Sequence, residues 1–201
     1  QQQGRGGVII NTSSGSHFGN FGQTNYAAAK GAIASMTYTW AIELARRHGR
    51  TISFDPNLRP TLWSSREAMR DTLNLLAEGS DCVLPGQAEG ELLTGSADPV
   101  AIAAFYRQRG ARLVVVKLGP EGAYYDGERG CGHVPAFPVT KVIDTVGAGD
   151  GFAVGVISAL LEGRAVVDAV RRGAWIGARA VQVRGDTEGL PTRAELLAAA
   201  L

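Results

Sequence analysis

The chain is poor in the residues that build disulfide frameworks and metal sites. Among 201 residues it has two cysteines, Cys82 and Cys131, and three histidines, and neither type recurs at the close spacing of a metal motif. The cysteines lie far apart in the sequence, so we expect reduced thiols in a cytoplasmic protein. These shortages argue against a disulfide-stapled secreted domain and against a zinc module.

Long apolar runs and an excess of one charge are also missing. No apolar stretch has the length that crosses a bilayer, and the glutamine-rich start lacks the charged-then-apolar layout of a signal peptide. The formal net charge is +1, and the basic residues are scattered along the chain. We therefore expect neither a membrane nor a nucleic acid as a partner. The length suits one α/β domain with a sizeable core.

Glycine, in contrast, is abundant, and one glycine-rich stretch is the leading candidate site. Gly147, Ala148 and Gly149 precede Asp150 and an apolar run over Phe152–Leu161, which predicts a buried helix with the glycines at its N-terminus. The N–H groups there have no intrahelical partner and can bind a phosphate. Asp150, in the first turn, could accept a hydroxyl proton. The alternative is an aspartate that only complements the helix dipole.

Five stretches together resemble the ribokinase (PfkB) family of carbohydrate kinases, and within it the 2-keto-3-deoxygluconate kinase branch. They are Asp144–Phe152, Phe54–Pro60, Leu84–Glu89, Lys117–Gly122 and Val181–Asp186. The resemblance covers about residues 45–201. It implies a ribokinase-like fold and ATP-dependent phosphorylation of a sugar or keto-sugar acid, with Mg²⁺ as the second cofactor.

The resemblance also implies a role for individual residues. Asp150 would be the catalytic base in contact with the substrate, and Arg59 would clamp a substrate carboxylate; an exposed loop arginine is the alternative for Arg59. Glu89 would assist Mg²⁺ through water, although Gly86 stands where the family usually has Asn. The anion hole would consist of Gly147, Ala148 and Gly149. The nucleotide would lie along Lys117, Gly119, Gly122, Thr145, Gly147 and Gly149.

The remaining pattern predicts a three-layer α/β domain with a largely parallel, Rossmann-like or ribokinase-like sheet. Strands are expected over Val8–Ser13, Thr51–Asp55, Cys82–Leu84 and Arg112–Lys117, followed by a hairpin closed by Asp126 and Gly127. Helices are expected to begin at the caps Thr24, Ser64, Asp98 and Thr192, of which Ser64 and Thr192 form capping boxes with Glu67 and Glu195.

Residues 1–48 resemble a different family, the short-chain dehydrogenase/reductases. Asn11–Ser14, Tyr26–Lys30 and Glu43–Arg46 carry this resemblance. It implies Tyr26 as a general acid whose pKa Lys30 lowers, and Ser13 as the group that orients a carbonyl. Tyr26 and Lys30 are four positions apart, so they would share one helix face. Gly4, Gly6 and Gly7 follow no predicted strand, whereas the glycines of a dinucleotide-binding loop come directly after one. We therefore interpret Ser13, Tyr26 and Lys30 as vestigial reductase residues.

The two resemblances together indicate a chimera in one α/β domain. Residues 1–49 would derive from the reductase and residues 50–201 from the kinase, with the join near Arg46–Arg50. The sequence shows no counterpart of the kinase family's leading strands and lid, so we expect reduced activity and a homo-oligomer. Three functions stay open: a sugar kinase, a folded chimera that binds nucleotide at best, and an NAD(P)-dependent reductase.

Overall fold

A computed structural model describes most of the chain from residue 48 onward. The described residues are 48–63, 65–185 and 187–201, with Asn25, Ala28, Ala29, Ala32, Met36, Thr39 and Trp40. They divide into two compact units: Gln1–Thr51 with Arg59–Thr72 is the first, and Ile52–Leu58 with Leu73–Leu201 is the second. The predicted strand Val8–Ser13 lies outside the described residues. So does most of the helix predicted from Thr24, although its seven described positions are helical.

In the first unit, the 3₁₀ helix η3 spans Pro60–Leu62. The helix α2, Arg66–Glu78, begins in this unit and ends in the second. The Ser65 hydroxyl accepts a hydrogen bond of 3.1 Å from the Ala68 N–H group. Ser65 therefore caps α2, one residue after the predicted cap Ser64, which is outside the described residues.

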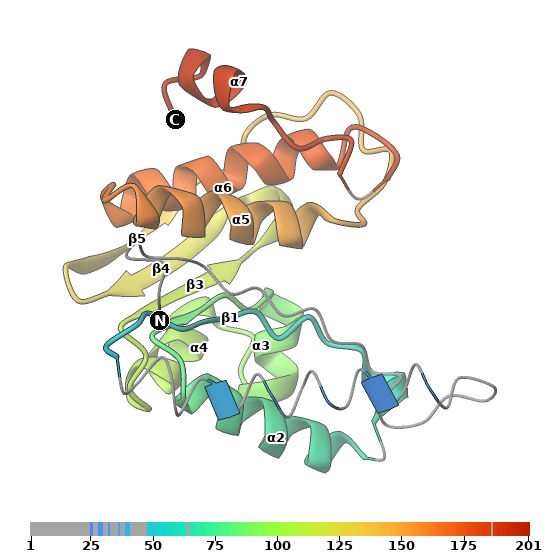
Figure 1. The fold of residues 1–201 in the computed structure, drawn as a ribbon, viewed down its shortest axis with the longest axis vertical. Helices are drawn as coiled ribbons and strands as arrows, with labels where there is room; N and C mark the ends of the chain where they lie inside the picture. Colours follow the sequence, from blue (N-terminus) through green and yellow to red (C-terminus); the bar gives the residue numbers. More distant parts are fainter. Residues whose placement is uncertain are drawn as a thin grey trace, which may run out of the picture. The chain divides into compact units, whose positions relative to one another are not determined.

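The second unit is built on a five-stranded sheet in the order β1-β2-β3-β4-β5 (Figure 1). The strands β1 (Ser53–Phe54), β2 (Cys82–Val83) and β3 (Leu113–Lys117) are parallel, which confirms the largely parallel sheet predicted for this part of the chain. The strands β4 (Ala123–Gly127) and β5 (Gly130–Val134) add an antiparallel hairpin. The mixed sheet confirms the predicted α/β class.

The hairpin exists as predicted, but its turn is displaced. Gly127 pairs with Gly130, so the turn residues are Glu128 and Arg129, and the expectation of a turn at Asp126 and Gly127 was wrong. The reason is the other neighbour of β4: its ladder with β3 continues to the pair of Leu113 and Gly127, so the chain stays extended for two more residues.

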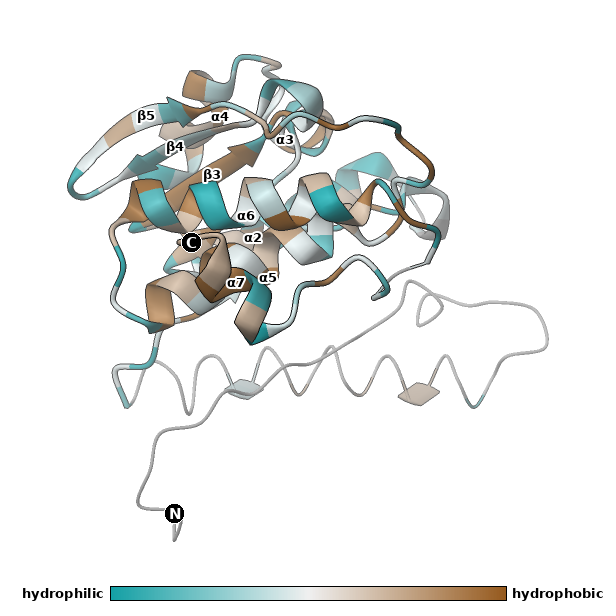
Figure 2. Cartoon of the chain, turned by 90° about the horizontal axis from the view of Figure 1, so that it is seen from above, coloured by the Kyte–Doolittle hydropathy of each residue, from teal (hydrophilic) through white to brown (hydrophobic). Residues whose placement is uncertain are grey.

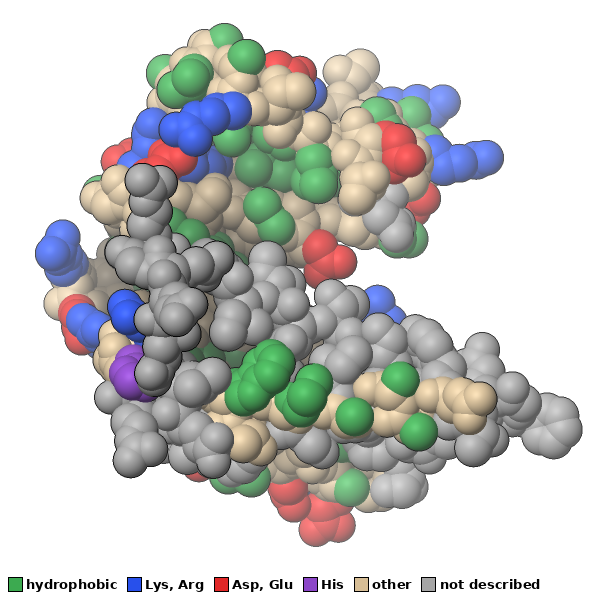
Figure 3. All heavy atoms as spheres, in the orientation of Figure 1, with side chains coloured by type: hydrophobic (Ala, Val, Ile, Leu, Met, Phe, Trp, Pro, Cys, Tyr) green, Lys and Arg blue, Asp and Glu red, His purple; other side chains and the backbone are tan. Residues whose placement is uncertain are grey.

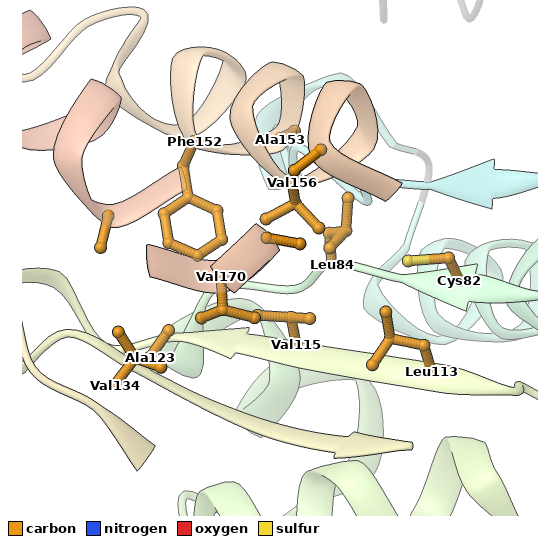
Figure 4. Close-up of a cluster of buried hydrophobic side chains, with 13 residues drawn as sticks. Cys82, Leu84, Leu113, Val115, Ala123, Val134, Phe152, Ala153, Val156 and Val170 are labelled. Atoms are coloured by element: carbon orange, nitrogen blue, oxygen red, sulfur yellow. The ribbon is translucent and has the colours of Figure 1, made fainter. Parts of the chain in front are cut away.

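Helices cover both faces of the sheet, as the uninterrupted hydrophobic run of β3 predicts (Figure 2). Val114 and Val116 pack in a cluster with Ile102 and Tyr106 of α4, Pro99–Arg107. Leu113 and Val115 face the other way, into a cluster with residues of α5 (Ala148–Leu161) and α6 (Val166–Ala180). Figure 4 shows Phe152 and Val156 of α5 and Val170 of α6 above Val115 and Leu113. The predicted three layers are confirmed.

The helices α5 and α6 pack against each other through glycines. A Cβ atom on Gly155 would stand 2.7 Å from the Gly173 Cα atom, and one on Gly173 would stand 2.8 Å from the Phe152 carbonyl oxygen. Real Cβ atoms do not approach backbone so closely, so glycine at these two positions sets the spacing of the helices. That spacing matters because α5 carries the candidate site at its first turn.

The other predicted helix starts are confirmed by their caps. The Asp98 carboxylate accepts from the Val100 N–H group at 3.1 Å, ahead of α4. Thr192 and Glu195 form a reciprocal capping box for α7, Arg193–Ala198. The helix α3, Gln87–Thr94, and the 3₁₀ helix η4, Gly119–Glu121, complete the second unit.

Two further expectations concern the cysteines and membrane-spanning helices. Both cysteines are free, Cys82 buried and Cys131 exposed, as predicted. In the described part of the chain, no helix is long and apolar enough to span a bilayer.

Candidate active site

The first turn of α5 holds two backbone N–H donors that have no partner in the part of the chain that the structure describes. Gly147 is the N-cap residue, with φ of 75°, and Gly149 and Asp150 are the second and third residues of the helix. The Ala148 N–H group donates to the Thr145 carbonyl at 3.4 Å. The Gly151 N–H group donates to the Gly147 carbonyl at 2.8 Å. Within the described residues, the N–H groups of Gly149 and Asp150 meet no acceptor. These two donors lie at the positive end of the helix dipole, where an anion is stabilised.

The loop before α5 is tied to the end of α6. The N–H groups of Ile143 and Asp144 donate to the Val181 carbonyl at 2.8 and 3.3 Å. The Asp144 carboxylate then accepts from the Val146 N–H group at 3.0 Å, which forms an Asx turn. Thr145 lies in this turn and is exposed. The loop therefore delivers Gly147 to the helix start in a fixed geometry.

A close ion pair joins the ends of two strands. Lys117 is the last residue of β3, and Asp55 directly follows β1; Lys117 Nζ lies 2.6 Å from Asp55 Oδ2. The side chains are 16% and 19% exposed. Lys117 Nζ is also 3.6 Å from the point where a Cβ atom on Gly149 would stand. The ammonium group therefore links the carboxyl ends of the parallel strands, where ligands collect in such sheets, to the first turn of α5.

Asp55 is a candidate site residue that the sequence analysis did not single out. Burial raises the pKa of its carboxyl group above the usual value against the lowering effect of Lys117, and the charges of Glu89 and Asp150 raise it further. Its Oδ1 atom is buried and has no hydrogen-bond partner among the described residues. The available signal was its position directly after a strand, inside the motif Phe54–Pro60.

Glu89 holds two loops together through backbone contacts. Its Oε1 atom accepts from the Leu58 N–H group and its Oε2 atom from the Gly86 N–H group, both at 2.7 Å. No group of three or more His, Cys, Asp or Glu among the described residues could hold a metal ion. Mg²⁺ usually keeps several waters and binds substrate phosphates with one or two carboxylates. Both carboxylate oxygens of Glu89 are thus engaged by backbone N–H groups, and its contact with Mg²⁺ through water stays a prediction.

The two glycines of the predicted nucleotide shelf have different surroundings. Gly122 has φ of 97°, and a Cβ atom there would stand 2.7 Å from the Ala136 nitrogen atom. Gly119 has φ of 60°, and nothing described lies within 4 Å of its Cβ position. Gly122 is thus required for packing against residues 134–136, whereas Gly119 leaves open space that a ligand could use.

The structure brings only part of the predicted site together. Lys117, Gly147, Ala148, Gly149 and Asp150 gather at the first turn of α5. Arg59 belongs to the first unit, where it precedes η3. The predicted reductase residues Ser13, Tyr26 and Lys30 lie outside the described residues.

Basic side chains do not form a stripe on the face drawn in Figure 3. There, the Lys and Arg side chains of the described residues stand in separate places, with Asp and Glu side chains among them. A nucleic-acid footprint would be a continuous basic patch. The absence of a nucleic-acid partner stays a prediction.

Comparison with known proteins identifies the family. The model of the pfkB family carbohydrate kinases matches residues 18–193. A 2-dehydro-3-deoxygluconokinase of Bacillus subtilis (strain 168) is 54% identical over 151 residues, which are 75% of this chain and 47% of that protein. The match from residue 18 includes Tyr26 and Lys30, which the sequence interpretation had given to a reductase.

Solved structures give the same answer for the fold. A PfkB protein from Polaromonas sp. JS666 is 59% identical with a TM-score of 0.72, covering 85% of this chain and 52% of the other. A fructokinase from Vibrio cholerae O395, bound to fructose, ADP and calcium ion, is 30% identical with a TM-score of 0.75. That match covers 83% of this chain and 55% of the other. The predicted ribokinase-like fold is confirmed, and the chain spans about half the length of the relatives it matches.

Proposed function

Because this chain belongs to the pfkB family of carbohydrate kinases, we propose that it phosphorylates a keto-sugar acid of the 2-keto-3-deoxygluconate type with ATP. The substrate class is supported by the 54% identity with a 2-dehydro-3-deoxygluconokinase. Nucleotide and divalent-cation use are supported by the fructokinase relative, which binds ADP and calcium. The chain covers about half of these proteins, so the activity is proposed for it and not transferred from them.

One observation carries the proposal: the N–H groups of Gly149 and Asp150 meet no acceptor among the described residues, and Lys117 Nζ lies 3.6 Å from the Cβ position of Gly149 in the same helix turn. Backbone donors and a cation at one helix start are the groups that stabilise a transferring phosphoryl group. In the proposed reaction the substrate hydroxyl oxygen bonds to the γ-phosphorus atom, and the bond from that phosphorus to the β,γ-bridging oxygen breaks. The hydroxyl proton goes to the Asp150 carboxylate, which is exposed at this helix start.

The remaining predicted residues take supporting roles in the proposal. Arg59 binds the substrate carboxylate in two parallel bonds. Gly119 and Gly122 line the nucleotide, together with Thr145 and the glycines of the anion hole. Glu89 would help to hold Mg²⁺ through water, and the ion would supply charge neutralisation on the phosphates.

A coupled assay on the full 201-residue chain tests the proposal. ADP release is measured with MgATP and 2-keto-3-deoxygluconate, then with fructose in its place, and the phosphorylated product is identified by mass. We expect turnover of the keto-sugar acid that disappears in Asp150→Asn. No turnover with either sugar, or a rate that Asp150→Asn leaves unchanged, would contradict the kinase.

Three finer interpretations remain part of the proposal. A reductase origin of residues 1–48, and so a chimera, stays a proposal. The reductase alternative predicts binding heat with NADPH, whereas the sugar kinase and the chimera predict none with NADPH. Reduced activity predicts a turnover number below that of the Bacillus relative in the same assay.

Self-association is expected because β1 is an edge strand of the described sheet, and edge strands can pair with another chain. Sedimentation of the chain at micromolar concentration decides this last point.

A further inference from the structure

The Lys117 ammonium group has N–H donors that make no hydrogen bond among the described residues, at the place where a phosphate group would bind. An ammonium group has three N–H donors. Among the described residues, Lys117 Nζ makes one hydrogen bond, to Asp55 Oδ2 at 2.6 Å. The nearest described atom to an added Cβ on Gly149 is this same nitrogen, at 3.6 Å. The side of Gly149 that would carry a side chain is therefore open except for the ammonium group.

The geometry of the ion pair between Lys117 and Asp55 does not indicate that its main role is to stabilise the fold. Both side chains are less than one-fifth exposed, and desolvation of two charges offsets much of their attraction. Asp55 Oδ1 is buried and has no hydrogen-bond partner within the described part of the chain, which leaves a polar atom unsatisfied there. Arg172 Nε and Arg179 Nε are also buried without a partner among the described residues, so an unsatisfied atom alone does not identify a functional pair. What distinguishes this pair is that Lys117 Nζ lies 3.6 Å from the Cβ position of Gly149. The pair is better explained by where it holds the ammonium group.

We propose that Asp55 is a positioning residue, which holds the Lys117 ammonium group against the first turn of α5 so that Lys117 binds a phosphate group there together with the N–H groups of Gly149 and Asp150. This inference rests on the proposed function, because it deepens the same anion site. A lysine side chain loses considerable freedom on binding an anion. The ion pair removes that freedom in advance, so the site is preorganised before the phosphate arrives.

A double-mutant cycle separates positioning from a direct role of Asp55. The variants are Asp55→Asn, Lys117→Met and the two combined, and calorimetry measures their affinity for MgATP and for inorganic tripolyphosphate. We expect Lys117→Met to weaken both by about 10- to 100-fold, the usual range for a hydrogen bond to a charged group. We expect Asp55→Asn to weaken both by about 3- to 10-fold, the effect of freeing one long side chain.

The combined variant is the decisive member of the cycle. If Asp55 acts only through Lys117, then Asp55→Asn produces no further loss in the Lys117→Met background. Equal losses in both backgrounds would overturn the inference. So would tighter binding by Asp55→Asn, because Asp55 would then be a competing counter-ion. Asp126→Asn is the matched control, since it removes a carboxylate 3.4 Å from Arg107 elsewhere on the sheet.

Two checks keep the outcome clear. Circular dichroism and thermal melting establish that each variant is folded, and Lys117→Gln replaces Lys117→Met if the latter does not fold. If the wild type turns over the sugar while Lys117→Met binds tripolyphosphate as tightly as the wild type does, this inference is wrong and the proposed kinase function is retained. Wild type that binds neither MgATP nor tripolyphosphate would overturn both.

Discussion

Two cations of the second unit each contact a carboxylate at 2.6 Å, and they differ in which partner is buried. Arg172 on α6 is 2% exposed, while its partner Glu162 is 44% exposed. Arg172 also donates to the Ser158 hydroxyl of α5 at 3.2 Å. In the other pair, Lys117 and Asp55 are both largely buried, at the strand ends. The first pair joins two helices far from the candidate site in the chain, and the second lies beside it.

The pKa shifts of the carboxyl groups in the two pairs have opposite directions. The hydrogen bond from Arg172 lowers the pKa of the Glu162 carboxyl group, which remains in contact with water. Burial raises the pKa of the Asp55 carboxyl group in spite of Lys117. The Arg172 pair therefore favours the ionised carboxylate, as a stabilising pair does, whereas burial makes ionisation of the Asp55 carboxyl group less favourable than it is in water. We expect changes near Lys117 to affect activity and changes near Arg172 to affect stability.

The largest expected effect is on catalysis at the candidate site beside Lys117. Asp150→Asn keeps the size of the side chain and removes the proton acceptor, so kcat should fall by about 10²- to 10⁴-fold. MgATP affinity should change little, because backbone N–H groups and Lys117 hold the phosphates. Steady-state kinetics and calorimetry measure the two quantities.

The matched control for this change is Asp168→Asn. Asp168 is the third residue of α6, as Asp150 is the third residue of α5, and both are exposed. The control should keep its rate. Equal losses in the two variants would show that helix stabilisation, and not proton transfer, is what Asp150 provides.

The next largest effect is on the free energy of unfolding, through the Arg172 pair. Arg172→Ala removes a buried long side chain between α5 and α6, and it should lower the free energy of unfolding by about 2–5 kcal/mol. The combined variant Asp55→Asn/Lys117→Met should stay within about 1 kcal/mol of wild type, because replacing a buried ion pair by uncharged groups is often neutral. Urea denaturation measures both. A larger loss in the combined variant than in Arg172→Ala would reverse the comparison.

Two glycines of α5 give a smaller and separable effect. Gly155→Ala places a Cβ atom against the Gly173 backbone, so it should destabilise by about 1–3 kcal/mol through overpacking. Gly149→Ala meets only Lys117 Nζ, at ordinary contact distance, so its melting temperature should not fall. It should instead weaken tripolyphosphate binding, because the methyl group occupies the open side of the anion site. A stable Gly155→Ala would mean that the helices can move apart.

The smallest effect is in the pH dependence of stability, and the two pairs should show opposite signs. The folded state binds a proton to Asp55 more readily than the unfolded state, since the pKa is raised. Wild type should therefore lose stability relative to Asp55→Asn as the pH rises through and above the usual aspartate value of about 3.9. The pKa of Glu162 is lowered, so its contribution is present above the usual glutamate value and is lost as the pH falls through the folded pKa.

Denaturant midpoints measured between acidic and neutral pH, for wild type, Asp55→Asn and Glu162→Gln, test these signs. Wild type that gains stability relative to Asp55→Asn as the pH rises would show that attraction to Lys117 outweighs burial at Asp55. The Lys117 pair would then resemble the Arg172 pair, and the comparison would no longer separate a stabilising pair from a positioning one.

Features governed by near neighbours in the chain could be predicted. The caps Asp98 and Thr192 bond to N–H groups two and three residues away, so local sequence decides them. The helix behind Gly147 was also predicted, and α5 begins at Ala148 with Asp150 in its first turn. The glycine-rich turn and the apolar run that follows it are sufficient to place the candidate anion site at this helix start.

The sequence alone thus determined the family motifs, the layered α/β class and the exposure of donors at the first turn of α5, because each depends on composition or on spacing within a few residues. Tertiary structure decided the rest. Asp55 and Lys117 are 62 positions apart and meet only because β2 pairs in parallel with both of their strands. Gly122 is required by residues 134–136, and the turn of the β4–β5 hairpin is set by β3. Contacts of this kind arise from chain packing across the sheet, and no local pattern encodes them.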